Sequence, residues 1–166
     1  MNKNKKIKNY TQAIISPDKI NKFQVIINFY LYHAPNIESI HRIGNYDIRK
    51  QEILLKKMLE IANIGKERGK FLEKIQKKSW ENIGLYGNYI DIKIPRFICS
   101  IGKRNGVKET QFESLLRHIR NSFAHGNVAS FKNGEIVLWD EKENKKKSII
   151  VITKNILRDW KACLEE

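Results

Sequence analysis

Residues 115–126 read LLRHIRNSFAHG, and they combine a clear helix pattern with a cluster of reactive side chains. Apolar residues recur here at the spacing of one helix face, namely Phe112, Leu115, Leu116, Ile119 and Phe123. This spacing predicts a helix over residues 110–125 that buries its apolar stripe. Thr110 and Glu113 have the spacing of an N-terminal capping box, and Gly126 stands where a left-handed residue commonly ends a helix.

The polar side of this helix carries residues suited to chemistry. At about 100° per residue, Arg120 falls at the border of the apolar stripe, whereas Asn121 and His125 fall on the polar face. Arg120 and His125 are roughly 140° apart around the axis and about 7.5 Å apart along it. One ligand contacts both only from a groove that straddles Asn121, or where the helix loosens at its end. Two such helices that face each other across a two-fold axis would bring both pairs together.

Arginine and histidine at this spacing indicate phosphoryl chemistry without a metal. Arginine offers a planar, permanently charged guanidinium that suits phosphate, and histidine exchanges protons near neutral pH. A structural interpretation competes with this one. In it, Arg120 pairs with an acidic neighbour and His125 favours the negative end of the helix.

The wider string from Leu116 to Gly126 resembles the motif of the HEPN (higher eukaryotes and prokaryotes nucleotide-binding) superfamily, in particular its nuclease branch. The resemblance implies a mainly α-helical bundle, usually dimeric, that acts as a metal-independent endoribonuclease, often as a toxin or phage-defence effector. It implies that Arg120, Asn121 and His125 are catalytic. Members paired with a nucleotidyltransferase antitoxin carry a tyrosine two residues after the histidine. This chain has Asn127 there, so regulation by modification of that tyrosine is not expected.

The expected reaction is attack of the ribose 2′-OH on the adjacent phosphate. His125 would act as general base, or as base and acid in the two halves of a dimer. Arg120 would stabilise the charged phosphorane, and Asn121 would orient the histidine or the phosphate. Arg117 and His118 are candidates for substrate contact.

A glycine-flanked basic loop precedes the helix at residues 102–106 and contains Lys103 and Arg104. These two residues are candidates for phosphate contact beside the active site, although a solvated turn is the commoner use of such a loop. A second loop, Asn36 to Tyr46, carries His41 and Arg42. Adjacent residues on a loop have no fixed geometry, so the expectation is that they lie outside the site.

Composition favours one domain that binds polyanions. The 166 residues, 41% of them hydrophobic, suffice for one core, so we predict a single domain over residues 1–166, with residues 1–9 as a basic tail that can be disordered. The formal net charge of +14 indicates attraction to RNA. Cys99 and Cys163 form no metal-like pair and indicate a reducing compartment. A signal peptide and a membrane-spanning run are both absent from the sequence, so a cytoplasmic protein without membrane contact is expected.

Helices are expected over much of the first half of the chain. The first runs from Ser16 to about His33. The next begins at Asp47 and continues either as one long kinked helix or as two helices that meet near 65–69, ending before Ser79. Residues 90–99 leave two alternatives open, a short strand at 90–94 or a brief helix after Pro95.

The pattern changes to strands after Gly126. Residues 128–132 and 135–139 predict a hairpin around an Asn133–Gly134 turn, followed by a charged loop at 140–147 and a third strand at 148–152. Thr153 is expected to cap a final helix. Together with the resemblance, this predicts a HEPN-like helical bundle with a small C-terminal antiparallel hairpin or meander and a final helix.

The sequence contains no Gly-rich phosphate loop, paired-acid site or His/Cys metal constellation, so no cofactor is expected. The expected partners are RNA, a second copy of the chain, and an antitoxin or defence-system protein. Two alternatives to an enzyme remain open. One is a non-catalytic RNA- or nucleotide-binding module, and the other is a structural partner in a larger complex.

Overall fold

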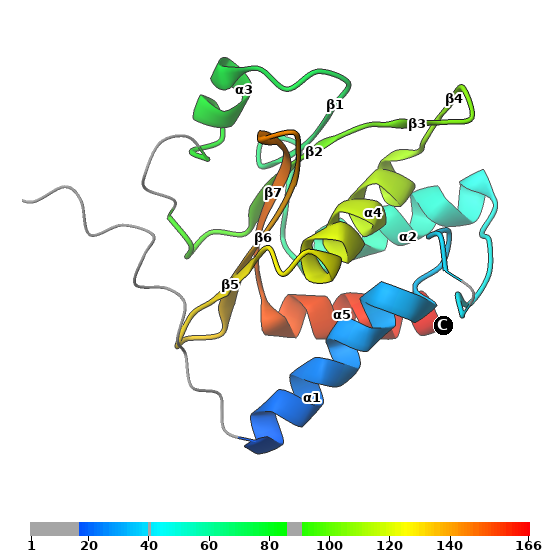
Figure 1. Ribbon diagram of the computed structural model, residues 1–166, viewed down its shortest axis with the longest axis vertical. Coiled ribbons are helices and arrows are strands. Elements are labelled where there is room, and N and C mark those ends of the chain that lie inside the picture. Colours follow the sequence, from blue (N-terminus) through cyan, green and yellow to red (C-terminus); the bar gives the residue numbers. More distant parts are fainter. Residues whose placement is uncertain (1–16, 40, 86–90) are drawn as a thin grey trace, which may run out of the picture.

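The computed structural model describes residues 17–39, 41–85 and 91–166, and a five-stranded mixed sheet lies at its centre. The strand order is β1, β2, β7, β6, β5, with β1 parallel to β2 and the other neighbours antiparallel. The bounds are Gly69–Leu72 (β1), Arg96–Ser100 (β2), Lys145–Thr153 (β7), Glu135–Lys142 (β6) and Val128–Ser130 (β5). Lys103–Arg104 (β3) and Val107–Lys108 (β4) form a separate hairpin that projects from the body (Figure 1).

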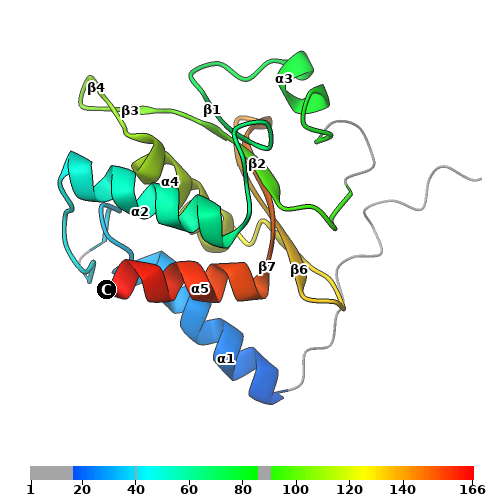
Figure 2. The ribbon, with the colours of Figure 1, turned by 180° about the vertical axis from the view of Figure 1, so that it is seen from behind.

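Helices cover one face of this sheet (Figures 1 and 2). They are α1 (Pro17–Asn28), the π-helical turn η1 (Phe29–His33), α2 (Ile48–Ile61), α4 (Gln111–Ala124) and α5 (Lys154–Glu165). The short α3 (Lys77–Glu81) lies on the other side. None of the helices in the described ranges is long and apolar enough to cross a membrane. The predicted tail at residues 1–9 and the predicted helix start at Ser16 lie outside the described residues.

The fold is therefore α/β, and the expectation of a mainly α-helical bundle is wrong. The error begins after α2, where the predicted long kinked helix or helix pair does not form. Asn63 has a φ of 50°, a left-handed conformation that stops the helix, and Gly69 and Phe71 belong to β1. A strand of four residues is too short for its alternation to stand out against a helix-like stripe of apolar residues.

The open alternative at residues 90–99 resolves as a strand, but at a later position than the alternation suggested. β2 begins directly after Pro95, whereas Ile92 and Ile94 lie outside any strand, and residue 90 is not among the described residues. Phe97 packs among the helices and Ile98 packs on the opposite face of the sheet. This two-residue alternation is what a strand buried on both faces requires.

The C-terminal half confirms the predicted hairpin, third strand and final helix, and corrects their lengths. The predicted charged loop at 140–147 is wrong, because β6 and β7 continue to a tight turn at Glu143 and Asn144, with φ values of 54° and 60°. The Asn133–Gly134 turn does join β5 to β6. Only Gly134 has positive φ there, so the two-residue turn type that Asn-Gly favours is not formed.

The helix α4 confirms the prediction made for residues 110–125 and lies at the centre of the core. Thr110 and Glu113 form the predicted capping box, and Leu115, Leu116 and Ile119 are fully buried. Below α4, Trp160 in α5 donates a hydrogen bond from Nε1 to the carbonyl of Met58 at 2.6 Å. This hydrogen bond joins α5 to α2, and α2 in turn packs against α4.

Gly69→Ala is expected to destabilise the protein by about 1 to 3 kcal/mol through overpacking. A Cβ at position 69 would lie 2.9 Å from Cγ2 of Ile64 and 3.0 Å from the buried ring of Phe97. In a helix the same change would stabilise by up to about 1 kcal/mol, so urea unfolding distinguishes the two folds by sign. As a control, Gly65→Ala meets only the exposed side chain of Glu67, which can rotate away, and should change stability by less than about 0.5 kcal/mol. A more stable Gly69→Ala variant would contradict β1.

Candidate functional site

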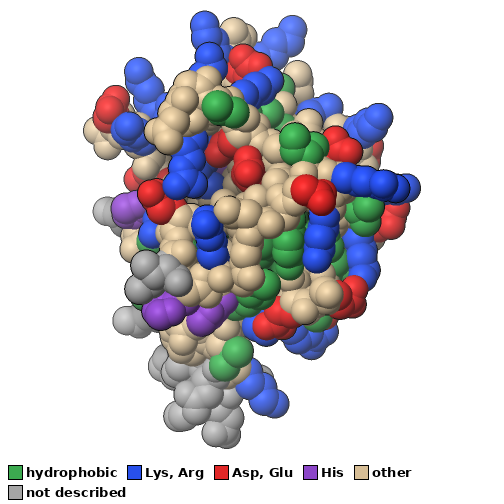
Figure 3. Space-filling model, turned by 90° about the vertical axis from the view of Figure 1, so that its right-hand side faces the viewer, with side chains coloured by type: hydrophobic (Ala, Val, Ile, Leu, Met, Phe, Trp, Pro, Cys, Tyr) green, Lys and Arg blue, Asp and Glu red, His purple; other side chains and the backbone are tan. Residues whose placement is uncertain are grey.

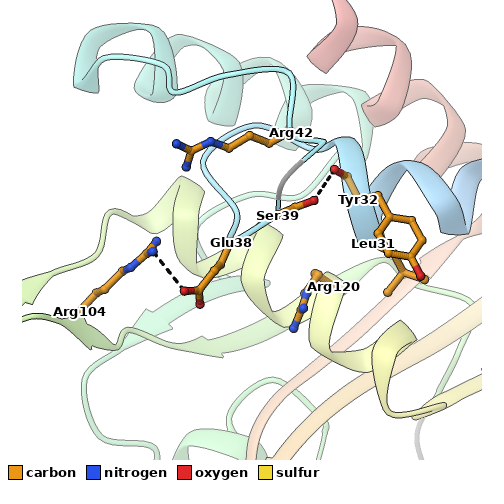
Figure 4. Close-up of a pocket in the computed structure, with 7 residues that line it drawn as sticks. All are labelled: Leu31, Tyr32, Glu38, Ser39, Arg42, Arg104 and Arg120. Atoms are coloured by element: carbon orange, nitrogen blue, oxygen red, sulfur yellow. Dashed lines mark hydrogen bonds and ion pairs between the residues drawn. The ribbon is translucent and has the colours of Figure 1, made fainter.

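The polar side of α4 faces an open pocket of about 480 Å³, shown in Figure 4. The pocket lies between α4, the turn η1 with the loop that follows it, and the β3–β4 hairpin. Its lining residues are Leu31, Tyr32, Glu38, Ser39, Arg42, Arg104 and Arg120. Of the predicted site residues, the structure therefore brings Arg120 and Arg104 to one pocket. Lys103 is exposed on β3 and is not part of the lining.

Positive charge dominates this pocket. Three arginines face one carboxylate, that of Glu38, which lies 3.5 Å from Nη2 of Arg104. On the face shown in Figure 3, Lys and Arg side chains are interspersed with Asp and Glu side chains. An arginine cluster with a surplus of positive charge is chemistry suited to phosphate, because guanidinium groups bind phosphate oxygens in a bidentate manner.

The side chain of Arg120 is hydrogen-bonded to that of Asn121, the next residue of the motif. Its Nη1 donates a hydrogen bond to Oδ1 of Asn121 at 3.3 Å, and the amide of Asn121 donates from Nδ2 to Oδ2 of Asp140 at 3.1 Å. The Nε of Arg120 is buried and has no hydrogen-bond partner within the described part of the chain. The guanidinium is thus oriented by a chain of polar contacts that begins in the sheet.

Asp140 lies in β6 and is the central acceptor of this chain. The same Oδ2 that binds Asn121 accepts a hydrogen bond from Nδ1 of His118 at 2.7 Å. Burial alone would raise the pKa of the Asp140 carboxyl. The hydrogen bonds from His118 and Asn121 and the charge of Arg117 outweigh burial and hold that pKa below its ordinary value of 3.8.

The two residues predicted to contact substrate are placed differently from Arg120. His118 is fully buried, and its Nε2 lies 2.8 Å from the carbonyl oxygen of Ser100. Arg117 forms a two-pronged ion pair with Glu109, at 2.6 and 2.8 Å, and also donates to the carbonyl of Ser100 at 3.0 Å. Burial would raise the pKa of Glu109, yet the hydrogen bonds from Arg117 and Gly102 lower it. Neither His118 nor Arg117 lines the pocket.

His125 stands apart from these contacts. It is the C-terminal cap of α4, its backbone N–H donates to the carbonyl of Asn121, and its side chain is exposed. Among the described residues its imidazole forms no hydrogen bond or ion pair. The next residue, Gly126, has a φ of 68°, which confirms the predicted left-handed end of the helix. Arg120 and His125 of one chain therefore do not share the pocket.

Three contributors to this arrangement escaped the sequence prediction. Arg42 lines the pocket although its loop was expected to lie outside the site, whereas the neighbouring His41 packs 6.1 Å from the ring of His33. Glu38 comes from the same loop. Asp140 was assigned to a charged loop, yet an acidic residue directly after the apolar run Ile136–Trp139 is a signal of a buried carboxylate that needs partners.

Within residues 17–39, 41–85 and 91–166, no three His, Cys, Asp or Glu side chains are grouped as metal ligands would be.

Asp140→Asn is expected to lower the free energy of unfolding at pH 7 by about 2 to 4 kcal/mol, because a neutral amide loses the charge-assisted hydrogen bonds from His118 and Asn121 and the ion pair with Arg117. The effect should depend on pH. The pKa of Asp140 is lowered in the folded protein, so its contribution is complete above the ordinary value of 3.8 and is lost as pH falls through the lower folded value. Urea unfolding of wild type and variant between pH 7 and pH 2 should therefore converge at acid pH. The exposed Asp159→Asn serves as the control, with a change below about 0.5 kcal/mol. A gap that is constant with pH would contradict this account.

The comparisons with known proteins extend beyond the motif helix. The sequence model of the family described as HEPN pEK499 p136 matches residues 1–166, the whole chain. Comparison with curated proteins and with solved structures finds no match. The match includes the helix α4, the strand that carries Asp140 and the loop that carries Arg42. The resemblance of residues 116–126 to the HEPN motif is thereby confirmed, and the chain belongs to the HEPN pEK499 p136 family.

Proposed function

We propose that this protein is an endoribonuclease that cleaves RNA through its own 2′-OH, without a metal ion. The observation that carries the proposal is the position of Arg120, which lines an arginine-rich pocket while the C-terminal cap of the same helix, His125, is exposed to solvent. An oriented guanidinium stabilises the charge that develops on a phosphate under attack. A solvent-accessible imidazole can take up and release protons near neutral pH.

In the proposed reaction, His125 removes the proton of the 2′-OH and the oxygen attacks the adjacent phosphorus. The bond from phosphorus to the 5′-oxygen breaks, that oxygen takes a proton from solvent water, and the protonated His125 returns its proton to solvent. Arg120 binds the non-bridging oxygens as charge accumulates on them. Asn121 and Asp140 act as positioning residues, since their hydrogen bonds orient the Arg120 guanidinium.

The active unit in this proposal is a homodimer. His125 does not line the pocket into which Arg120 of the same chain opens. A second copy related by a two-fold axis near the C-terminal end of α4 would bring its own His125 to that pocket and complete both sites.

A toxin or phage-defence role is proposed for this activity, with an antitoxin or trigger protein as a further partner. An unrestrained ribonuclease would degrade the RNA of the cell that makes it, so such an enzyme needs a restraint.

A non-catalytic RNA-binding module is the second candidate. It is favoured by the lack of any hydrogen bond within the described chain that would orient the His125 imidazole. RNA binding without cleavage, under conditions where the dimer forms, would select it.

Arg120→Ala and His125→Ala should each abolish RNA cleavage, whereas the exposed Arg158→Ala on α5 should leave it unchanged. If each site combines Arg120 of one chain with His125 of the other, a 1:1 mixture of the two inactive variants regains activity. Half of the dimers are then mixed and hold one intact site, so about a quarter of the wild-type rate is expected. Cleavage is measured on a fluorescent RNA after denaturation and joint refolding of the variants. A mixture that stays inactive while mixed dimers are shown to form would contradict the shared site.

The ends of the RNA products test the chemistry directly. Attack by the 2′-OH leaves a 2′,3′-cyclic phosphate and a 5′-OH, which mass spectrometry distinguishes from the ends left by water. A single 2′-deoxy nucleotide at the cleaved position should stop cleavage there, and EDTA should not. Products with 5′-phosphate ends, or loss of activity in EDTA, would rule out the proposed mechanism.

A further inference from the structure

We propose that the pocket beside Arg120 binds a second backbone phosphate of single-stranded RNA, next to the phosphate that is cleaved, and that Glu38 occupies this place until RNA arrives. The inference rests on the proposed ribonuclease function and adds a substrate subsite to it. Its ligand is the phosphodiester chain on one side of the scissile bond.

The three arginines of the pocket come from three separate segments of the chain. Arg42 lies on the loop after η1, Arg104 on β3 and Arg120 on α4. Arg120 serves the scissile phosphate in the proposed reaction, so Arg42 and Arg104 remain for another anion. A volume of about 480 Å³ lies in the range of small-ligand pockets and exceeds what one phosphate group needs.

Glu38 lies between these arginines in the pocket (Figure 4). Its carboxylate oxygen is 3.5 Å from Nη2 of Arg104, and the two side chains are 87% and 62% exposed. Carboxylate and phosphate present similar oxygen pairs to a guanidinium, so Glu38 takes the position that a phosphate would fill. Because exposed ion pairs contribute little free energy, an incoming phosphate can displace this one.

The β3–β4 hairpin is anchored where it meets α4, which holds Arg104 near the pocket. Gly102 donates its backbone N–H to Glu109 at 2.6 Å, and Glu109 is bound by Arg117 of α4. The contacts among Gly102, Glu109 and Arg117 thus also support the second subsite.

Tyr32 supplies the apolar part of the subsite. Its ring is about half exposed at the edge of the pocket, and its carbonyl accepts a hydrogen bond from Oγ of Ser39 at 2.6 Å, which ties η1 to the loop that carries Glu38 and Arg42. Proteins that bind single-stranded RNA commonly stack unpaired bases on such rings. Phosphate contacts beside a stacking surface favour single-stranded RNA over a duplex.

Two substrates distinguish the effect of a substitution in this subsite from the effect of one in the catalytic centre. One is a dinucleoside monophosphate, which contains only the scissile phosphate. The other is a tetranucleotide with one ribonucleotide, at its second position, so that a single bond can be cut and a phosphate flanks it on either side. The kcat and KM of both are measured for wild type, Arg104→Ala, Glu38→Gln and the control Arg158→Ala.

For the tetranucleotide, Arg104→Ala is expected to raise KM about tenfold, the loss of one charge-assisted contact, with a much smaller effect on the dinucleotide. Glu38→Gln is expected to lower KM for the tetranucleotide, because it removes the competing carboxylate, and Arg158→Ala should alter neither substrate. Equal effects of Arg104→Ala on both substrates, or a higher KM in Glu38→Gln, would overturn the subsite while leaving the ribonuclease proposal intact.

If no variant and no wild-type preparation cleaves either substrate, the ribonuclease proposal fails, and the subsite is still tested by binding. Fluorescence anisotropy of a labelled tetranucleotide should then show weaker binding to Arg104→Ala and tighter binding to Glu38→Gln. Equal affinities for the three proteins would overturn the subsite as well.

Discussion

The buried carboxylate of Asp140 is the contact on which the arrangement of the candidate site depends. It is carried by the sheet, and its Oδ2 accepts hydrogen bonds from His118 and Asn121 on α4. A buried charge is costly unless such donors surround it, so sheet and helix can pack closely only in the one register that satisfies it. Asn121 also accepts a hydrogen bond from Arg120, so the position of Asn121 orients the Arg120 guanidinium. The direction of the arginine is therefore set by the central sheet and not by the helix alone.

The local parts of the fold could be predicted from sequence, and the non-local parts could not. The helix α4, with its capping box and left-handed end, follows from residues within a few turns of one another. Strand β1 instead exists because it pairs with β2, whose first residue is 24 positions beyond the last of β1. Nothing within residues 69–72 marks that partner. The continuous apolar run 149–152 in β7 likewise reflects burial on both faces, which only the assembled sheet explains.

The candidate site divides in the same way. Arg120, Asn121 and His125 were found because they lie within six consecutive residues of a recognisable motif. Arg42 and Glu38 reach the pocket through a loop whose course depends on the packing of η1 against α4, which a sequence pattern does not reveal. His118 shows the converse. His118 is polar and lies beside the motif, so it was predicted to contact substrate. The structure shows instead that its side chain is fully buried and hydrogen-bonded to Ser100 and Asp140. A helix seen in isolation does not show which of its polar faces meets another layer.

The strand order has a consequence for the protein while it is being made. Strand β7 lies between β2 and β6, so the sheet remains divided until residues 145–153 have left the ribosome. Before that point β6, which carries Asp140, has only β5 as a partner, and β2 has only β1. A nascent chain would therefore carry the motif helix for some time without an oriented Arg120. An RNA-cleaving protein with this topology would gain an oriented Arg120 only after residues 145–153 had been synthesised and had paired with β2 and β6.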